Sequence, residues 1–169
     1  ESDWSSDVCS SDLEQLAQLD AATRNANDPY LLLWHWTNNT NELARQQFLA
    51  LEGQPVLEEP ELQLALGGIY AKSEPQKAIA LMQHALSLYR EGEQVNGRIL
   101  TSLSTLYMGQ KQYGQAYLWG KVSESFQNAA EVSATRFSLY HSLSKQEQES
   151  LDSEAATLVE QLKSGTYHP

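Results

Sequence analysis

Residues 66–85 read LGGIYAKSEPQKAIALMQHA, and residues 103–123 read LSTLYMGQKQYGQAYLWGKVS. The first leucine of the first stretch recurs 37 residues later in the second, and Ala78 recurs 38 residues later as Ala116. A fixed period in this range is typical of stacked helical hairpins, in which each unit buries its apolar face against the next. The repeat therefore predicts an all-α chain built as a superhelical stack of antiparallel hairpins.

The start of the chain has an unusual composition. Residues 3–13 read DWSSDVCSSDL, which is one reading frame of a common short-read sequencing adapter. We expect residues 1–13 to be translated adapter and not native protein, so they say nothing about the fold. The alternative is a disordered Ser/Asp-rich tail, which carries no function either. The only cysteine, Cys9, lies in this stretch, so we expect neither a disulfide nor a thiolate metal site.

Length and charge limit the possible classes of protein. The chain has 169 residues and a net charge of −11, which becomes −7 over residues 14–169 because residues 1–13 hold four acids and no Lys or Arg. We expect a single repeat domain over 14–165 and a tail over 166–169. An acidic chain without a basic block does not favour nucleic acid as a partner. No apolar run approaches the roughly 20 residues that span a bilayer, so we expect no transmembrane segment in this fragment.

Start and stop residues divide the first third of the chain into helices. We expect a first helix over 13–26, with Leu16, Leu19 and Thr23 on one side. Asp28-Pro29 caps and opens a second helix that holds residues 30–36. Asn39, with Glu42 three residues later, resembles a capping box for a third helix that ends at Gly53. Residues 54–59 are predicted to be a linker.

The remaining helices have equally clear limits. Pro60 and Pro75 open the two helices of a first unit, about 60–92, and Asn96-Gly97 opens a second unit, about 96–126. After a break near 128–132, Ser133 caps a predicted short helix with Ala134, Phe137 and Tyr140 on one face. Ser144 with Glu147 is a second capping box. The last helix carries an apolar stripe and stops near Lys163 and Gly165; the stripe consists of Leu151, Ala155, Leu158 and Leu162.

Small and aromatic residues stand at matching places in the two units, which resemble tetratricopeptide (TPR) repeats. In that family, small residues let neighbouring helices approach closely. The first unit is one residue shorter in its turn than the second, and neither unit ends in the family's proline. The resemblance implies that the small positions are Gly67, Ala78, Ala85, Ser104, Ala116 and Ser123, and that the aromatic positions are Tyr70, Tyr107 and Tyr113.

The TPR resemblance also implies an inner groove, lined by the first helix of each hairpin, that binds a protein or a peptide. The pattern of side chains departs from the Lys/Asn pattern with which some family members hold a peptide carboxylate, so we do not expect that class of ligand. An ordinary solvated surface is the alternative. The residues that the resemblance places along the groove are Glu61, Leu64, Gly68, Lys72, Arg98, Thr101, Thr105 and Met108.

A second resemblance covers most of residues 14–163. The segments LAQL (16–19), DPYLLLWHW (28–36) and FLALE (48–52) are similar to a family of uncharacterised gammaproteobacterial lipoproteins known only as a domain of unknown function. The resemblance implies a periplasmic protein, anchored to a membrane by a lipid-bearing cysteine upstream of the adapter stretch. A cytoplasmic location is the alternative.

Candidate chemical sites have simpler structural explanations. The histidines at 35, 84, 141 and 168 are scattered, without an HExxH motif, so we expect packing or surface roles and no metal site. Glu58, Glu59 and Glu61 surround Pro60, where acids favour the positive end of a helix. Tyr30, Trp34 and Trp36 form an aromatic patch, for which core packing is favoured over a role as an exposed anchor.

The sequence therefore predicts a non-catalytic scaffold that binds another protein, with no catalytic residue, metal or cofactor. Its partner and its oligomeric state are not indicated by the sequence. One alternative is the helical accessory domain of an enzyme whose catalytic part is missing upstream. Another is a purely structural homo-oligomer.

Overall fold

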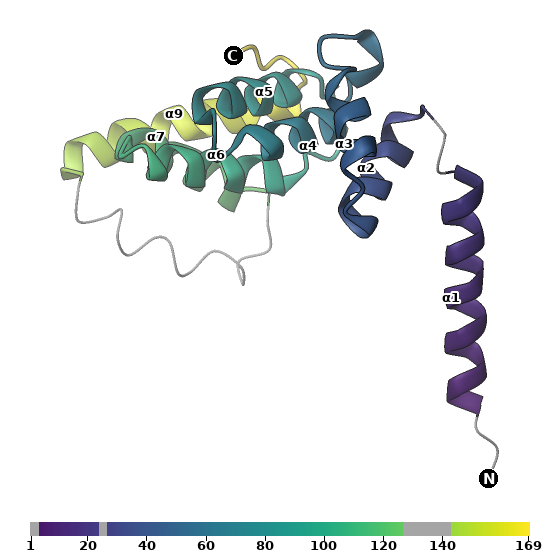
Figure 1. Cartoon of the computed structure of the whole chain (residues 1–169). Coiled ribbons are helices and arrows are strands. Elements are labelled where there is room, and N and C mark those ends of the chain that lie inside the picture. The colour runs from purple at the N-terminus through teal and green to yellow at the C-terminus, as the bar shows by residue number, and fades with distance from the viewer. Residues whose placement is uncertain (1–3, 24–26, 127–142) are drawn as a thin grey trace. The chain divides into compact units, whose positions relative to one another are not determined.

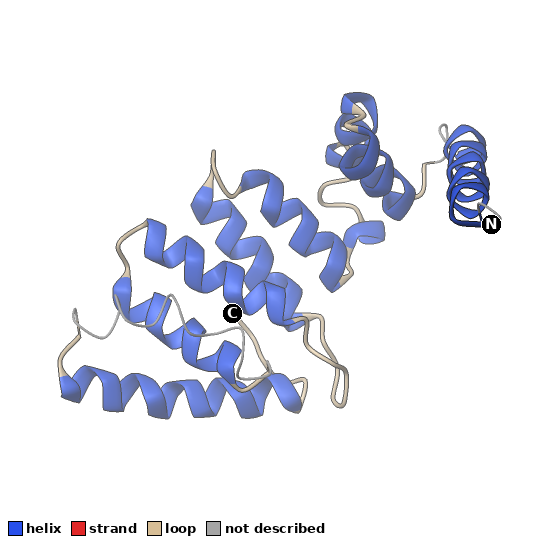
Figure 2. Cartoon of the chain, turned by 90° about the horizontal axis from the view of Figure 1, so that it is seen from below, coloured by secondary structure: helices blue, strands red, loops and turns tan. Residues whose placement is uncertain are grey.

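The computed structural model describes residues 4–23, 27–126 and 143–169. These residues form eight α-helices and one short 3-10 helix, without a β-strand among them (Figure 2). The prediction of an all-α chain is thus confirmed, whereas the helix predicted around Ala134, Phe137 and Tyr140 lies outside the described residues. The chain forms two compact units, Glu1–Leu57 and Glu58–Pro169, and each is described by itself. That residues 14–165 act as one repeat domain stays a prediction.

The first unit contains α1 (Trp4–Thr23), α2 (Pro29–Asn39), α3 (Glu42–Leu49) and a 3-10 helix, η1 (Pro55–Leu57) (Figure 1). Helix α2 begins as predicted, because the Asp28 carboxylate accepts hydrogen bonds from the backbone N–H groups of Tyr30 and Leu31. Helices α2 and α3 pack together, with Leu32, Ala44 and Phe48 buried.

The predicted cap of α3 is wrong. Asn39 is the last residue of α2, and the side chain of Asn41 instead accepts hydrogen bonds from the N–H groups of Leu43 and Ala44. Glu42 is therefore the first residue of the helix, one position after the cap, and cannot complete a capping box. The predicted linker over 54–59 contains η1, whose Leu57 is fully buried.

The second unit contains α4 (Pro60–Tyr70), α5 (Pro75–Ser87), α6 (Gly97–Gly109), α7 (Tyr113–Glu124) and α9 (Lys145–Lys163). Helix α4 packs on α5, α6 on α7, α5 on α6, and α7 on α9 (Figure 1). Because short turns join α4 to α5 and α6 to α7, each pair is an antiparallel hairpin. Pro60 and Pro75 open their helices as predicted.

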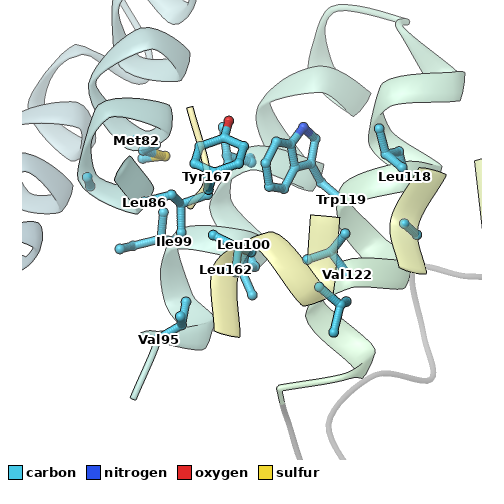
Figure 3. Packing of buried hydrophobic residues seen from close by; sticks show 14 of the residues in the cluster. Met82, Leu86, Val95, Ile99, Leu100, Leu118, Trp119, Val122, Leu162 and Tyr167 are labelled. Atoms are coloured by element: carbon cyan, nitrogen blue, oxygen red, sulfur yellow. The ribbon is translucent and has the colours of Figure 1, made fainter. Parts of the chain in front are cut away.

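Small side chains lie at the contacts between these helices. Ala78, Ala85 and Ala116 have no exposed surface, and Gly67 is buried against Ala78 and Met82. Larger apolar side chains fill the space that remains between α5, α6, α7 and α9 (Figure 3). The predicted inward direction of Ala78 and Ala116 is confirmed.

The C-terminal segment closes this core. Ser144 and Glu147 form the predicted capping box of α9. The chain then turns at Gly165, where φ is +65° and a Cβ would lie 2.5 Å from the backbone nitrogen of Glu91. Residues 166–169, predicted to be a tail, form no helix, yet Tyr167 is buried with its ring edge-on to that of Trp119, 6.1 Å between centroids (Figure 3).

Candidate functional site

The described residues form an open pocket of about 380 Å³ on the second unit, which we term the α4–α6 groove. Helix α4 and its end contribute one side, α6 contributes the other, and α5 contributes a single side chain between them. The volume lies at the lower end of the range for ligand pockets, a size that suits one or two side chains. The lining residues are Gly68, Ala71, Met82, Arg98, Thr101, Ser102, Thr105 and Leu106.

The structure brings together four residues that the sequence placed in the groove, namely Gly68, Arg98, Thr101 and Thr105. The other four, Glu61, Leu64, Lys72 and Met108, do not line it. The Glu61 carboxylate instead accepts a hydrogen bond from the Asn96 side chain at 2.8 Å, and Leu64 packs against the core. Lys72 is exposed and Met108 is half-buried.

Four lining residues were missed by the sequence: Ala71, Met82, Ser102 and Leu106. Helical periodicity could have found two of them. On α6 the lining positions are 98, 101, 102, 105 and 106, the spacing of a single helix face. Met82 could not be found in this way, because its place in the lining depends on how α5 packs against α4 and α6.

Most of the groove surface is apolar. Met82 is buried beneath it, Ala71 and Leu106 add aliphatic surface, and Gly68 leaves open space because a Cβ there would meet no atom within 4 Å. The hydroxyls of Thr101 and Thr105 donate to the backbone oxygens of Gly97 and Thr101, at 2.7 and 2.8 Å. Their protons are therefore committed to the helix, and the groove offers mainly apolar contact.

Arg98 is the charged side chain of the groove. It is exposed, and among the described residues no carboxylate lies within ion-pair distance of its guanidinium. Lys121 and Lys163 do have acidic neighbours, Asp152 at 3.6 Å and Glu160 at 3.7 Å. Among the described residues, other exposed cations resemble Arg98 in having no ion pair, namely Lys72, Arg90 and Lys111. The groove thus combines an apolar floor with a positive charge at its edge.

His35 of α2 lies close to two side chains of α1, those of Asp20 and Thr23. It is buried, with Nε2 3.0 Å from Thr23 Oγ1 and Nδ1 2.9 Å from Asp20 Oδ1. A nucleophilic hydroxyl must direct its proton to the base, but Thr23 donates its proton to the Leu19 carbonyl at 2.7 Å. The Nδ1–Asp20 approach also lacks the alignment of a hydrogen bond. These side-chain contacts connect α1 to α2.

The remaining histidines and acids have other neighbours. His84 Nε2 lies 2.7 Å from the Glu58 carboxylate, and His168 is exposed, while His141 lies outside the described residues. Within the described part of the chain, no three His, Cys, Asp or Glu side chains gather to hold a metal ion. Each described helix is too short or too polar to cross a bilayer.

The aromatic patch is only partly buried. Tyr30 is 44% exposed, so the core packing favoured for it is wrong, while Trp34 and Trp36 are half-buried. Trp34 contacts the His35 ring edge-on, and the Arg45 guanidinium lies 5.8 Å from the Trp36 ring centre. Trp36 of α2 therefore contacts α3, whereas Trp34 contacts its neighbour His35 on the same helix.

Comparison with known proteins gives one family match. A family model described as a protein of unknown function, DUF2989, matches residues 5–121. The match runs from α1 into α7 and contains every residue that lines the α4–α6 groove. It begins inside residues 1–13, whose adapter origin stays a prediction. No curated protein and no solved structure matches the chain.

Proposed function

The chain belongs to the DUF2989 family of proteins of unknown function, and on that premise we propose that it is a non-catalytic scaffold that binds another protein through the α4–α6 groove. The proposal includes a TPR-like stack of the hairpins α4–α5 and α6–α7. Burial of small residues at equivalent places in both hairpins supports this architecture. In such stacks the inner face of the hairpins is the working surface.

The observation that carries the proposal is the groove itself. Exposed residues from two hairpins surround an apolar hollow whose size suits a side chain of a partner. Peptide segments bind such grooves by inserting apolar anchors between helices. The hydroxyls of Thr101 and Thr105 already donate to the backbone, and Arg98 supplies the single charge of the groove. These side chains favour contact with a partner over bond-making chemistry.

A selection of peptides tests the proposal. The purified chain is panned against phage-displayed random dodecapeptides, and the binding site of the best synthetic peptide is mapped by NMR. We expect shifts of the backbone signals of Gly68, Thr101 and Thr105. Gly68→Arg should weaken binding at least tenfold, because its side chain fills the open space over the groove.

Gly109→Arg is the matched control. Gly109 is also exposed, a Cβ there also meets no atom within 4 Å, and the residue does not line the groove. Binding should survive this change. Peptides that map elsewhere, or that bind the Gly68→Arg chain equally well, would contradict the proposal.

We also propose that the intact gene product is a periplasmic lipoprotein. The support is the resemblance of residues 16–19, 28–36 and 48–52 to gammaproteobacterial lipoproteins. Expression of the gene with its native upstream sequence, in cells fed radioactive palmitate, tests this location. A labelled product that fractionates with membranes is expected, and an unlabelled product would contradict it.

A further inference from the structure

We propose that the segment bound in the α4–α6 groove presents an internal Asp or Glu side chain to Arg98, next to an apolar side chain that enters the groove. This inference rests on the proposed function and specifies the chemistry of the partner. It is drawn from the position of Arg98, from its lack of an acidic neighbour, and from the apolar surface beside it.

The position of Arg98 is unfavourable for the protein alone. It is the second residue of α6, where the positive end of the helix dipole disfavours a cation. Among the described residues no carboxylate forms an ion pair with its guanidinium. The Glu61 carboxylate at this end of α6 binds the Asn96 side chain instead, at 2.8 Å. An acidic group of a partner would supply the ion pair that Arg98 lacks, and it would add negative charge near the helix N-terminus.

The net negative charge of the chain does not oppose this pairing at close range. Charges separated by more than about 8 Å are largely screened at physiological ionic strength. An arginine fork, in contrast, holds a carboxylate by two parallel hydrogen bonds at contact distance. The local geometry at Arg98 therefore decides which side chain is accepted.

A side-chain carboxylate fits the groove better than a chain terminus. Beyond Arg98, the hydroxyl protons of Thr101 and Thr105 are already donated to the backbone. The groove also continues along α6 from Arg98 to Leu106, roughly 12 Å of helix. A segment that passes through this length can place its apolar side chain over Met82 while its acid reaches Arg98.

Calorimetry with the groove-binding dodecapeptides tests the inference. The peptides are synthesised with amidated C-termini, so that side chains supply their only carboxylates. We expect Arg98→Gln to weaken binding roughly five- to tenfold, Arg98→Lys to weaken it less, and replacement of the peptide acid by its amide to cost the same as Arg98→Gln. The two losses should not add, because each removes the same pair. Arg98→Glu should recover affinity with a peptide whose acid is changed to lysine.

Lys111→Gln is the matched control. Lys111 is exposed, lies beyond the other end of α6, roughly 20 Å from Arg98 along the axis, and does not line the groove. It should leave affinity unchanged. Peptides that lose affinity with Gly68→Arg but not with Arg98→Gln overturn the acidic partner and leave the proposed function standing. Binding that requires a free C-terminus in place of the side-chain acid also overturns it, and peptides that map outside the groove overturn the proposed function itself.

Discussion

The two hairpins of the second unit bring their helices together by different chemistry at the same place. In α4–α5, Gly67 has no side chain, and a Cβ there would lie 3.3 Å from the backbone oxygen of Ala78. In α6–α7, the equivalent Ser104 donates a hydrogen bond of 2.7 Å to the backbone oxygen of Ala116. At the equivalent carbonyl, the first hairpin makes room by having no side chain at Gly67, whereas the second hairpin forms a hydrogen bond through the Ser104 hydroxyl. A repeat can therefore keep its geometry while its chemistry changes.

The equivalent tyrosines differ in a similar way. Tyr70 is half-buried, and the Lys77 ammonium lies 3.6 Å from its ring centre. Tyr107 is buried, and its hydroxyl lies 3.4 Å from the Gln83 side-chain nitrogen of the preceding hairpin. The second hairpin contacts α9 and the C-terminal segment as well as its predecessor. Its tyrosine is therefore an interior residue, whereas that of the first hairpin is not.

The largest expected effect comes from a charge placed between the hairpins. Ala85 has no exposed surface, so Ala85→Arg should lower the free energy of unfolding by more than about 4 kcal/mol, because it buries an unpaired cation. Ala80→Arg, at an exposed position of the same helix, should change it by less than about 0.5 kcal/mol. Urea unfolding followed by circular dichroism gives both values. An unchanged midpoint for Ala85→Arg would contradict the helix register.

The next effect concerns the close approach of Gly165, in the C-terminal segment, to the connection between α5 and α6. Gly165→Ala should cost about 2–4 kcal/mol, because φ is positive and the added Cβ would lie 2.5 Å from the Glu91 nitrogen and 2.8 Å from the Arg90 carbonyl carbon. Gly92→Ala isolates the backbone cost, since its φ is +80° with no atom within 4 Å, and should lose only about 1 kcal/mol. Equal losses in thermal unfolding would show that the approach to the α5–α6 connection is not tight.

The helix starts that were predicted correctly from the sequence are those that depend on residues within one turn of chain. Pro60 and Pro75 open helices through their own fixed φ, and the Ser144–Glu147 box requires only residues of a single turn. The cap of α3 was misassigned because Asn39 and Asn41 have the same cap chemistry, and the end of α2 decides between them.

Features that depend on packing between distant segments were not predictable. The burial of Tyr167 depends on how α9 lies on α7 and returns the chain to the α5–α6 connection. The groove was half predicted because Gly68 and Thr105 follow from the repeat. On α6 the lining ends at Leu106 and does not include Met108, whereas on the side of α4 it consists of Gly68 and Ala71. A repeat spacing fixes which residues are equivalent, but not how far one helix is shifted along the next.

Crowding at the first hairpin gives a smaller effect. Gly67→Leu should cost about 2–3 kcal/mol, because a Cβ already meets Met82 Cγ at 3.2 Å and the longer side chain overpacks the contact. Gly68→Leu, at the neighbouring open position, should be neutral or stabilise by up to about 1 kcal/mol, since leucine favours helix. Urea unfolding of the pair measures the difference. A tolerated Gly67→Leu would mean that the close approach is not required.

Loss of the hydroxyl at the second hairpin should have a milder result. Ser104→Ala removes the bond to the Ala116 oxygen without crowding, and should cost about 1 kcal/mol. Ser150→Ala, at an exposed position on α9, serves as the control and should stay within about 0.5 kcal/mol. A Ser104→Ala chain as stable as the control would indicate that packing alone, as at Gly67, joins α6 to α7.

The smallest effect links the interior position of the second hairpin to alkaline pH. Burial, with a smaller contribution from Tyr107, raises the pKa of Tyr167 from 10.0 to about 12. The unfolded chain therefore loses this proton first, so the stabilisation is complete below pH 10 and falls as the pH rises towards 12. With solvent screening, wild type should lose up to about 1 kcal/mol more than Tyr167→Phe between pH 9 and pH 11, whereas the two should stay close at pH 7. Urea unfolding measures the loss of stability between pH 9 and pH 11 for both chains. If wild type and Tyr167→Phe lose the same amount, the Tyr167 hydroxyl lies in water. The C-terminal segment would then not explain why the second hairpin is more buried than the first.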